Sequence, residues 1–71
     1  MTQSEFIDEI NKALHIRRDN ELASLLRVEP PVISKIRNDR MPVGPTMLIR
    51  IHEAIGWSFP KMREMLGEGK A

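Results

Sequence analysis

Apolar residues recur at helical spacing in five short segments of the chain, and no segment alternates between apolar and polar residues as a strand would. The first helix is expected from about Gln3 to His15, because Phe6, Ile7, Ile10 and Leu14 follow that spacing. Thr2 and Glu5 stand three residues apart before it, which predicts a capping box at its start.

The next two predicted helices are short and are separated by a turn at residues 27–29. Asp19 is expected to be the N-cap of the second helix, which ends near Leu26. Pro30 takes the first position of the third helix, where proline is best tolerated, and the third helix is expected to reach about Asn38.

Two more helices are predicted after a loop of turn residues at 38–44. Pro45 opens the fourth helix, and Gly56 ends it as a C′ glycine. Ser58 is the expected N-cap of the fifth helix, with Trp57 and Met62 at the positions of a hydrophobic staple.

The length of 71 residues allows one domain, which the pattern bounds at 1–67, with residues 68–71 expected to form a disordered tail. There is no cysteine, and His15 and His52 have no ligand-spaced companions, so neither a metal site nor a cofactor is expected. No catalytic constellation is visible, which argues against an enzyme. With no signal peptide and no apolar stretch of about 20 residues, a cytoplasmic protein without membrane contact is expected.

Charge is distributed unevenly although the net charge is only +1. Residues 1–26 hold three basic and five acidic side chains, whereas residues 27–50 hold five basic and two acidic ones. A basic middle third is what a face that meets phosphate requires.

The segment from Asp19 to Asn38 has the apolar positions of a helix-turn-helix. Two helices that cross steeply need a small residue where their backbones approach, and Ala23 stands there. The pair is then locked by apolar residues on both helices and in the turn, namely Leu22, Leu26, Val28, Ile33 and Ile36. The segment resembles the helix-turn-helix of the Cro and phage-repressor family, also called XRE-like or lambda-repressor-like domains, and the resemblance extends from about Phe6 to Leu66.

This resemblance implies an all-α fold in which a recognition helix at about 30–38 enters the major groove of DNA. The segment departs from the family pattern in two respects. Arg27 replaces the usual turn glycine, at a site that commonly needs positive φ and costs a non-glycine residue about 1 kcal/mol. Pro31 and Val32 replace polar residues, so they are expected to pack on thymine methyl groups.

The expected DNA contacts lie on the outward face of the third helix and beside it. Lys35 is expected at a guanine edge, and Ser34 or Asn38 at a base or a phosphate. Arg37 either grips the DNA backbone or pairs with a surface carboxylate. The other expected contacts flank the motif: Arg17, Arg18, Asn20, Arg27, Arg40 and Thr46.

The function that these features predict is a sequence-specific transcriptional regulator that binds a two-fold operator in double-stranded DNA as a homodimer, with no small-molecule ligand. The expected dimer patch consists of residues of the last helix and its entry: Trp57, Phe59, Met62 and Leu66. The alternative is a protein-interaction module on the same fold, such as an antirepressor, an antitoxin subunit or a phage adaptor. The donor-poor start of the third helix favours that alternative.

Overall fold

The computed structural model describes residues 1–67, and the predicted tail at 68–71 lies outside the described residues. Within 1–67 the chain forms five helices and no strand, which confirms the all-α prediction. The helices are α1 (Gln3–Leu14), α2 (Asp19–Leu26), α3 (Pro30–Arg37), α4 (Pro45–Ile55) and α5 (Phe59–Leu66). None of these helices is long and apolar enough to cross a membrane.

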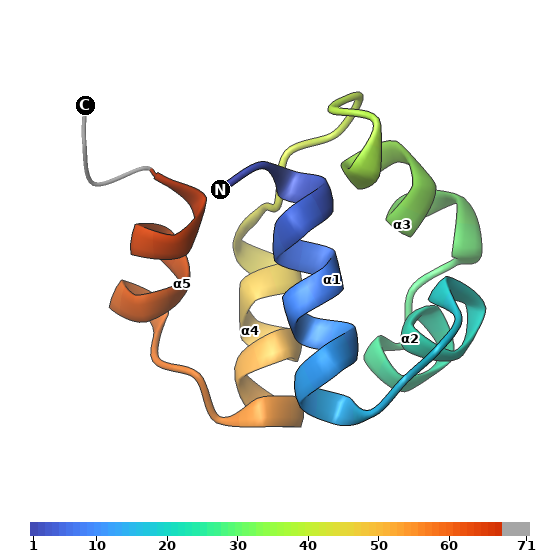
Figure 1. Cartoon of the computed structure of the whole chain (residues 1–71), viewed down its shortest axis with the longest axis horizontal. Coiled ribbons are helices and arrows are strands. Elements are labelled where there is room, and N and C mark those ends of the chain that lie inside the picture. Colours follow the sequence, from blue (N-terminus) through green and yellow to red (C-terminus); the bar gives the residue numbers. More distant parts are fainter. Residues whose placement is uncertain (68–71) are drawn as a thin grey trace.

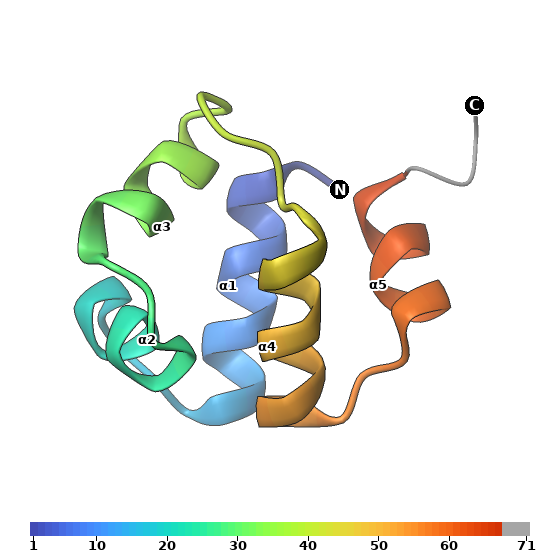
Figure 2. The ribbon, with the colours of Figure 1, turned by 180° about the vertical axis from the view of Figure 1, so that it is seen from behind.

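Helices α1 and α4 lie side by side at the centre of the molecule (Figure 1). The pair α2 and α3 packs on one side of them, and α5 packs on the other, as the reverse view also shows (Figure 2). The surface around α3 and the surface around α5 therefore face different sides of the molecule.

The core draws apolar side chains from all five helices. The residues predicted to lock the helix-turn-helix are almost fully buried, and Val28 in the turn is half-buried. Burial of one such side chain contributes about 1.5–3 kcal/mol, so this packing holds α2 and α3 on the central pair. The buried residues are Phe6, Ile7, Ile10, Leu22, Ala23, Leu26, Ile33, Ile36, Val43, Met47, Leu48, Ile51 and Met62.

Local capping chemistry sets several of the helix ends as predicted. In the capping box of α1, the Thr2 hydroxyl accepts from the Glu5 amide at 3.1 Å, and the Glu5 carboxylate accepts from the Thr2 amide at 2.8 Å. The hydrogen bond from the Thr2 backbone amide is the largest cause that lowers the pKa of the Glu5 carboxyl, and the Thr2 hydroxyl is the second. The Ser58 hydroxyl accepts from the Lys61 amide at 3.2 Å, and Gly56 ends α4 with φ 88°.

The prediction for Asp19 was wrong. Helix α2 begins at Asp19 itself, and its N-cap is Arg18, which makes no side-chain capping bond. The Asp19 carboxylate accepts hydrogen bonds from Arg37 and Asn11 instead. The Arg37 guanidinium gives this carboxylate two parallel charge-assisted hydrogen bonds, which supply more energy and geometric specificity than one bond to a helix amide.

The predicted dimer patch also needs correction. Met62 has no exposed surface and is part of the core, so it cannot contact a second copy. Trp57, Phe59 and Leu66 are half-buried and pack against the same core. The ring centroids of Trp57 and Phe6 lie 6.3 Å apart, and the Lys61 ammonium lies over the Trp57 ring, 4.9 Å from its centroid.

Candidate nucleic-acid interface

The turn between α2 and α3 begins at Arg27, which has φ 58° and ψ 43°. Positive φ was predicted here, and the structure confirms it. In this conformation the Val28 amide donates to the Ala23 carbonyl at 2.9 Å, which closes the end of α2. The Arg27 side chain is 73% exposed and lies 3.6 Å from the Glu53 carboxylate. Such a surface pair contributes about 0–1 kcal/mol, so the guanidinium is free to exchange it for a phosphate.

The C-terminal end of α2 is also held from α4. The Arg50 guanidinium donates to the Leu26 carbonyl at 3.2 Å and to the Arg27 carbonyl at 3.4 Å. These carbonyls have no partner within the helix, so the Arg50 guanidinium satisfies them. Its positive charge also interacts favourably with the negative end of the helix dipole. Sequence reasoning counted Arg50 only as a basic charge and missed this contact.

The Arg37 guanidinium is directed toward α1 and α2 of the protein itself. Its Nε and Nη2 atoms donate to the two carboxylate oxygens of Asp19 at 2.6 and 3.0 Å, and Nη2 also lies 2.8 Å from Asp8. Its Nη1 atom donates to the hydroxyl and the carbonyl of Ser4 at 2.9 and 3.2 Å. Two roles were predicted for Arg37, and the structure shows the pairing with carboxylates. Arg37 is therefore not a DNA contact.

This pairing has a clear electrostatic consequence. The hydrogen bond from the Arg37 guanidinium, supported by Asn11, lowers the pKa of the Asp19 carboxyl. The same bond raises the already high pKa of Arg37. Both groups therefore carry their charges at neutral pH.

The end of α3 is fixed a second time, by Gln3 in the first turn of α1. Its side-chain amide donates to the Ile36 carbonyl at 2.8 Å and to the Met41 carbonyl at 2.9 Å. This single residue therefore ties the last turn of α3 and the following loop to α1. A glutamine in a first turn gives no sequence signal for such a contact.

The outward face of α3 carries the predicted contact residues Pro31, Ser34, Lys35 and Asn38, all of which are exposed. We call these four residues the α3 face. Asn38 is the C-cap, and its amide group donates to the Ser34 carbonyl at 2.8 Å. Lys35 is exposed on this face, and its ammonium group has three N–H donors.

The first turn of α3 has a different character. Pro30 and Pro31 have no N–H, and the Val32 amide donates to the Glu29 carbonyl at 2.9 Å. Glu29 is the N-cap but makes no side-chain capping bond. The two prolines and the bonded Val32 amide therefore offer no backbone donor to an anion, and the half-buried Val32 with the exposed Pro31 presents an apolar surface.

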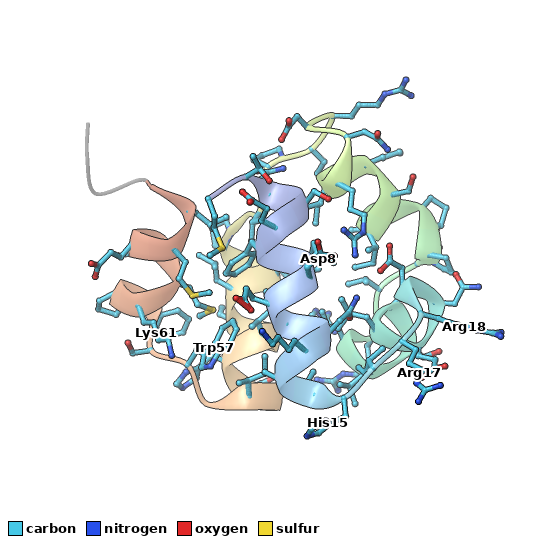
Figure 3. All side chains as sticks on the ribbon, viewed as in Figure 1. Asp8, His15, Arg17, Arg18, Trp57 and Lys61 are labelled. Carbon is cyan, nitrogen blue, oxygen red and sulfur yellow. The ribbon has the colours of Figure 1, made fainter. Side chains whose placement is uncertain are left out.

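The remaining predicted contacts lie on exposed parts of the surface around the motif. Arg17 and Arg18 precede α2 and extend away from the body of the molecule (Figure 3). Because Asp19 binds Arg37, this end of α2 adjoins the C-terminal end of α3. The other exposed contacts are Asn20 in the first turn of α2, Arg40 in the loop after α3, and Thr46 in the first turn of α4.

No cluster of three or more histidine, aspartate or glutamate side chains suited to a metal ion occurs among residues 1–67. The predicted dimer residues Trp57, Phe59 and Leu66 lie at α5, across the central helices from α3 (Figures 1 and 2). The structure thus separates the predicted dimer patch from the predicted contacts on α2 and α3, whereas Thr46 follows Pro45, which lines a groove together with Phe59. In comparisons with protein-family models, with curated proteins and with solved structures, the chain matched none.

Proposed function

We propose that this protein is a sequence-specific DNA-binding regulator of the Cro and phage-repressor type, with a lambda-repressor-like fold and α3 as its recognition helix. The observation that carries the proposal is the two-sided character of α3. Ile33 and Ile36 are buried against the core, while Ser34 and Lys35 are exposed on the outer face. A helix presented in this way fits the major groove, which is about 12 Å wide.

Each exposed polar residue of the α3 face then has a role that its chemistry allows. Lys35 donates to the O6 and N7 acceptors of guanine, the commonest specific contact in the major groove. Ser34 and Asn38 contact a neighbouring base or a phosphate. The apolar first turn, with Pro31 and Val32, packs on thymine methyl groups.

Phosphate contacts come from the exposed basic and polar residues that flank the motif. Arg17 and Arg18 stand before the first turn of α2, whose free amides favour an anion. Thr46 stands in the first turn of α4, where Gly44 is the N-cap and supplies no side chain to occupy the amides. The remaining phosphate contacts are Asn20, Arg27 and Arg40.

A homodimer on a two-fold operator remains part of the proposal. With Met62 buried, the apolar surface available near α5 consists of Trp57, Phe59 and Leu66 together with Ile49, which is 48% exposed. Ile49 and Phe59 line a shallow groove between α4 and α5. This groove is where we expect two copies to meet.

The second candidate function is a protein-interaction module. It is favoured by Leu25, an apolar residue of α2 that is 50% exposed, beside a shallow depression lined by Asn20, Glu21 and Ser24. This apolar surface and the donor-poor first turn of α3 suit a protein partner as well as a groove. Binding to DNA distinguishes the two functions.

The first experiment measures fluorescence anisotropy of labelled random-sequence duplex DNA at low salt. A DNA-binding protein binds such duplexes, and log Kobs falls with log salt concentration by about 0.9 for each phosphate contact. Selection from a random duplex pool then identifies the preferred site and shows two-fold symmetry through its half-site spacing. No binding at low salt would leave the interaction module as the better function.

The second experiment replaces Ser34 and Lys35 together with alanine. The preference for the selected site should disappear, while the circular dichroism spectrum and Tm stay as in the wild type, because both side chains are exposed. The matched control is Lys12→Ala, which removes an exposed lysine from α1. Retained preference in the double variant would contradict the assignment of α3 as the recognition helix.

A further inference from the structure

Arg37 stands apart from the other polar side chains of α3. Ser34, Lys35 and Asn38 are exposed, whereas the Arg37 side chain is only 23% exposed. Its guanidinium joins three helices, because it binds Asp19 at the start of α2 and both Ser4 and Asp8 on α1. Figure 3 shows Asp8 on the side of α1 that faces α2 and α3.

The apolar contacts of α3 leave one degree of freedom weakly defined. The helix has eight residues, and Ile33 and Ile36 are its two buried side chains. These two side chains, with Val32 packed against the core beside them, fix how deeply the short helix sits, but hydrophobic contact is not directional. The direction of α3 is therefore set by hydrogen bonds, which Gln3 makes to the last turn of the helix and the following loop and Arg37 makes to α1 and α2.

The Arg37–Asp19 pair supplies such a directional interaction. A guanidinium and a carboxylate that share two parallel hydrogen bonds, here at 2.6 and 3.0 Å, must lie nearly in one plane. The remaining edge of the guanidinium is held by Ser4 at 2.9 Å. Rotation of α3 breaks these bonds together, because all of them belong to one rigid group.

We propose that Arg37 is the positioning residue of the recognition helix, and that its pairing with Asp19 sets sequence discrimination without contact between Arg37 and DNA. This inference rests on the proposed function of α3. Hydrogen bonds to base edges require side chains placed within about 0.5 Å, whereas attraction to phosphates tolerates larger errors. Loss of the pair therefore reduces the preference for one sequence more than it reduces binding to DNA in general.

The test compares Arg37→Lys and Asp19→Asn with the wild type. Lysine keeps the positive charge but cannot form the two parallel bonds. Asparagine removes a negative charge, so that electrostatics alone would strengthen DNA binding. Asp19→Asn also serves as the second variant if Arg37→Lys does not fold. The matched control is Arg63→Lys, the same exchange at an exposed arginine of α5.

The readout is the ratio of Kd for a scrambled duplex to Kd for the duplex recovered by selection, at a temperature where circular dichroism shows every variant folded. We expect this ratio to fall about tenfold or more in Arg37→Lys and in Asp19→Asn, comparable to the loss of one specific base contact. The salt dependence for the scrambled duplex should not change, and Arg63→Lys should keep the ratio.

A phosphate contact by Arg37 gives the opposite pattern. Arg37→Lys then keeps the ratio, and Arg37→Ala lowers the slope of log Kobs against log salt concentration by about 0.9. A merely structural role lowers Tm but keeps the ratio among folded variants. Either result overturns the inference.

Amide hydrogen exchange in the free protein gives a readout that does not depend on DNA. Exchange at Ile36 and Asn38 in Arg37→Lys should accelerate severalfold more than exchange at Ile51 in α4, and equal acceleration overturns the inference. A wild type without any duplex preference overturns the proposed function and this inference with it. A wild-type preference that both variants retain overturns the inference alone.

Discussion

The interaction between Asp19 and Arg37 has a stability contribution that a double-mutant cycle can isolate. The perturbations are Asp19→Asn, Arg37→Gln and the two changes together. Each charge-assisted hydrogen bond contributes about 1.5–3 kcal/mol when it is shielded from water. The pair has two such bonds, but the Asp19 side chain is 36% exposed, so solvent screening reduces the sum. We expect a coupling free energy of about 1–2 kcal/mol.

The coupling should depend on pH in one direction. Because the Arg37 guanidinium lowers the pKa of Asp19 in the folded protein, the unfolded chain binds the proton more tightly. The contribution is therefore complete above the unfolded pKa of about 3.9 and is lost as the pH falls through the folded pKa. The stability difference between the wild type and Asp19→Asn should shrink between about pH 7 and about pH 3.

The assay is urea unfolding followed by circular dichroism at both pH values, with the free energy extrapolated to water. The control cycle pairs Arg37 with Asp8, whose side chain is 65% exposed, and its coupling should stay below about 1 kcal/mol. An Asp19–Arg37 coupling below about 0.5 kcal/mol, or one that is equal at the two pH values, would refute the reasoning.

Three further substitutions test other contacts by the same unfolding assay. Met62→Ala should destabilise the fold by about 2–5 kcal/mol because Met62 has no exposed surface, and its sedimentation should match that of the wild type. Arg27→Gly should raise stability by about 0.5–1 kcal/mol, since glycine accepts φ 58° without strain and the pair with Glu53 is weak; a loss of stability would show that the Arg27 side chain matters. Gln3→Ala removes the donor of the Met41 carbonyl and one of two donors of the Ile36 carbonyl, which keeps the Asp39 amide at 3.2 Å. It should cost about 1–3 kcal/mol; a neutral result would mean that water replaces the amide.

The helices and their ends could be predicted from the sequence because the interactions that set them are local. The capping box of α1, the serine cap of α5 and the glycine after α4 all act over three or four residues. The positive φ at Arg27 was expected from the resemblance, because the corresponding turn position of the family is usually glycine. Each helix end was therefore placed within one residue.

The roles of individual polar residues required the tertiary structure. Asp19 has the chemistry of an N-cap, but Arg37 lies 18 positions away in the chain and folding brings its guanidinium to 2.6 Å from that carboxylate. Gln3 likewise reaches carbonyls 33 and 38 positions away. Local spacing carries no information about such distant partners.

The same limit applied to Met62, which an apolar pattern places on a helix but cannot assign to the core or to an interface. The sequence by itself determined five helices, the N-caps of α1 and α5, the glycine that ends α4 and the apolar surfaces that pack the helices together, because propensity and capping act between near neighbours. Only the tertiary structure decided which polar side chains point inward. That choice depends on charged groups from three helices that meet after the chain has folded.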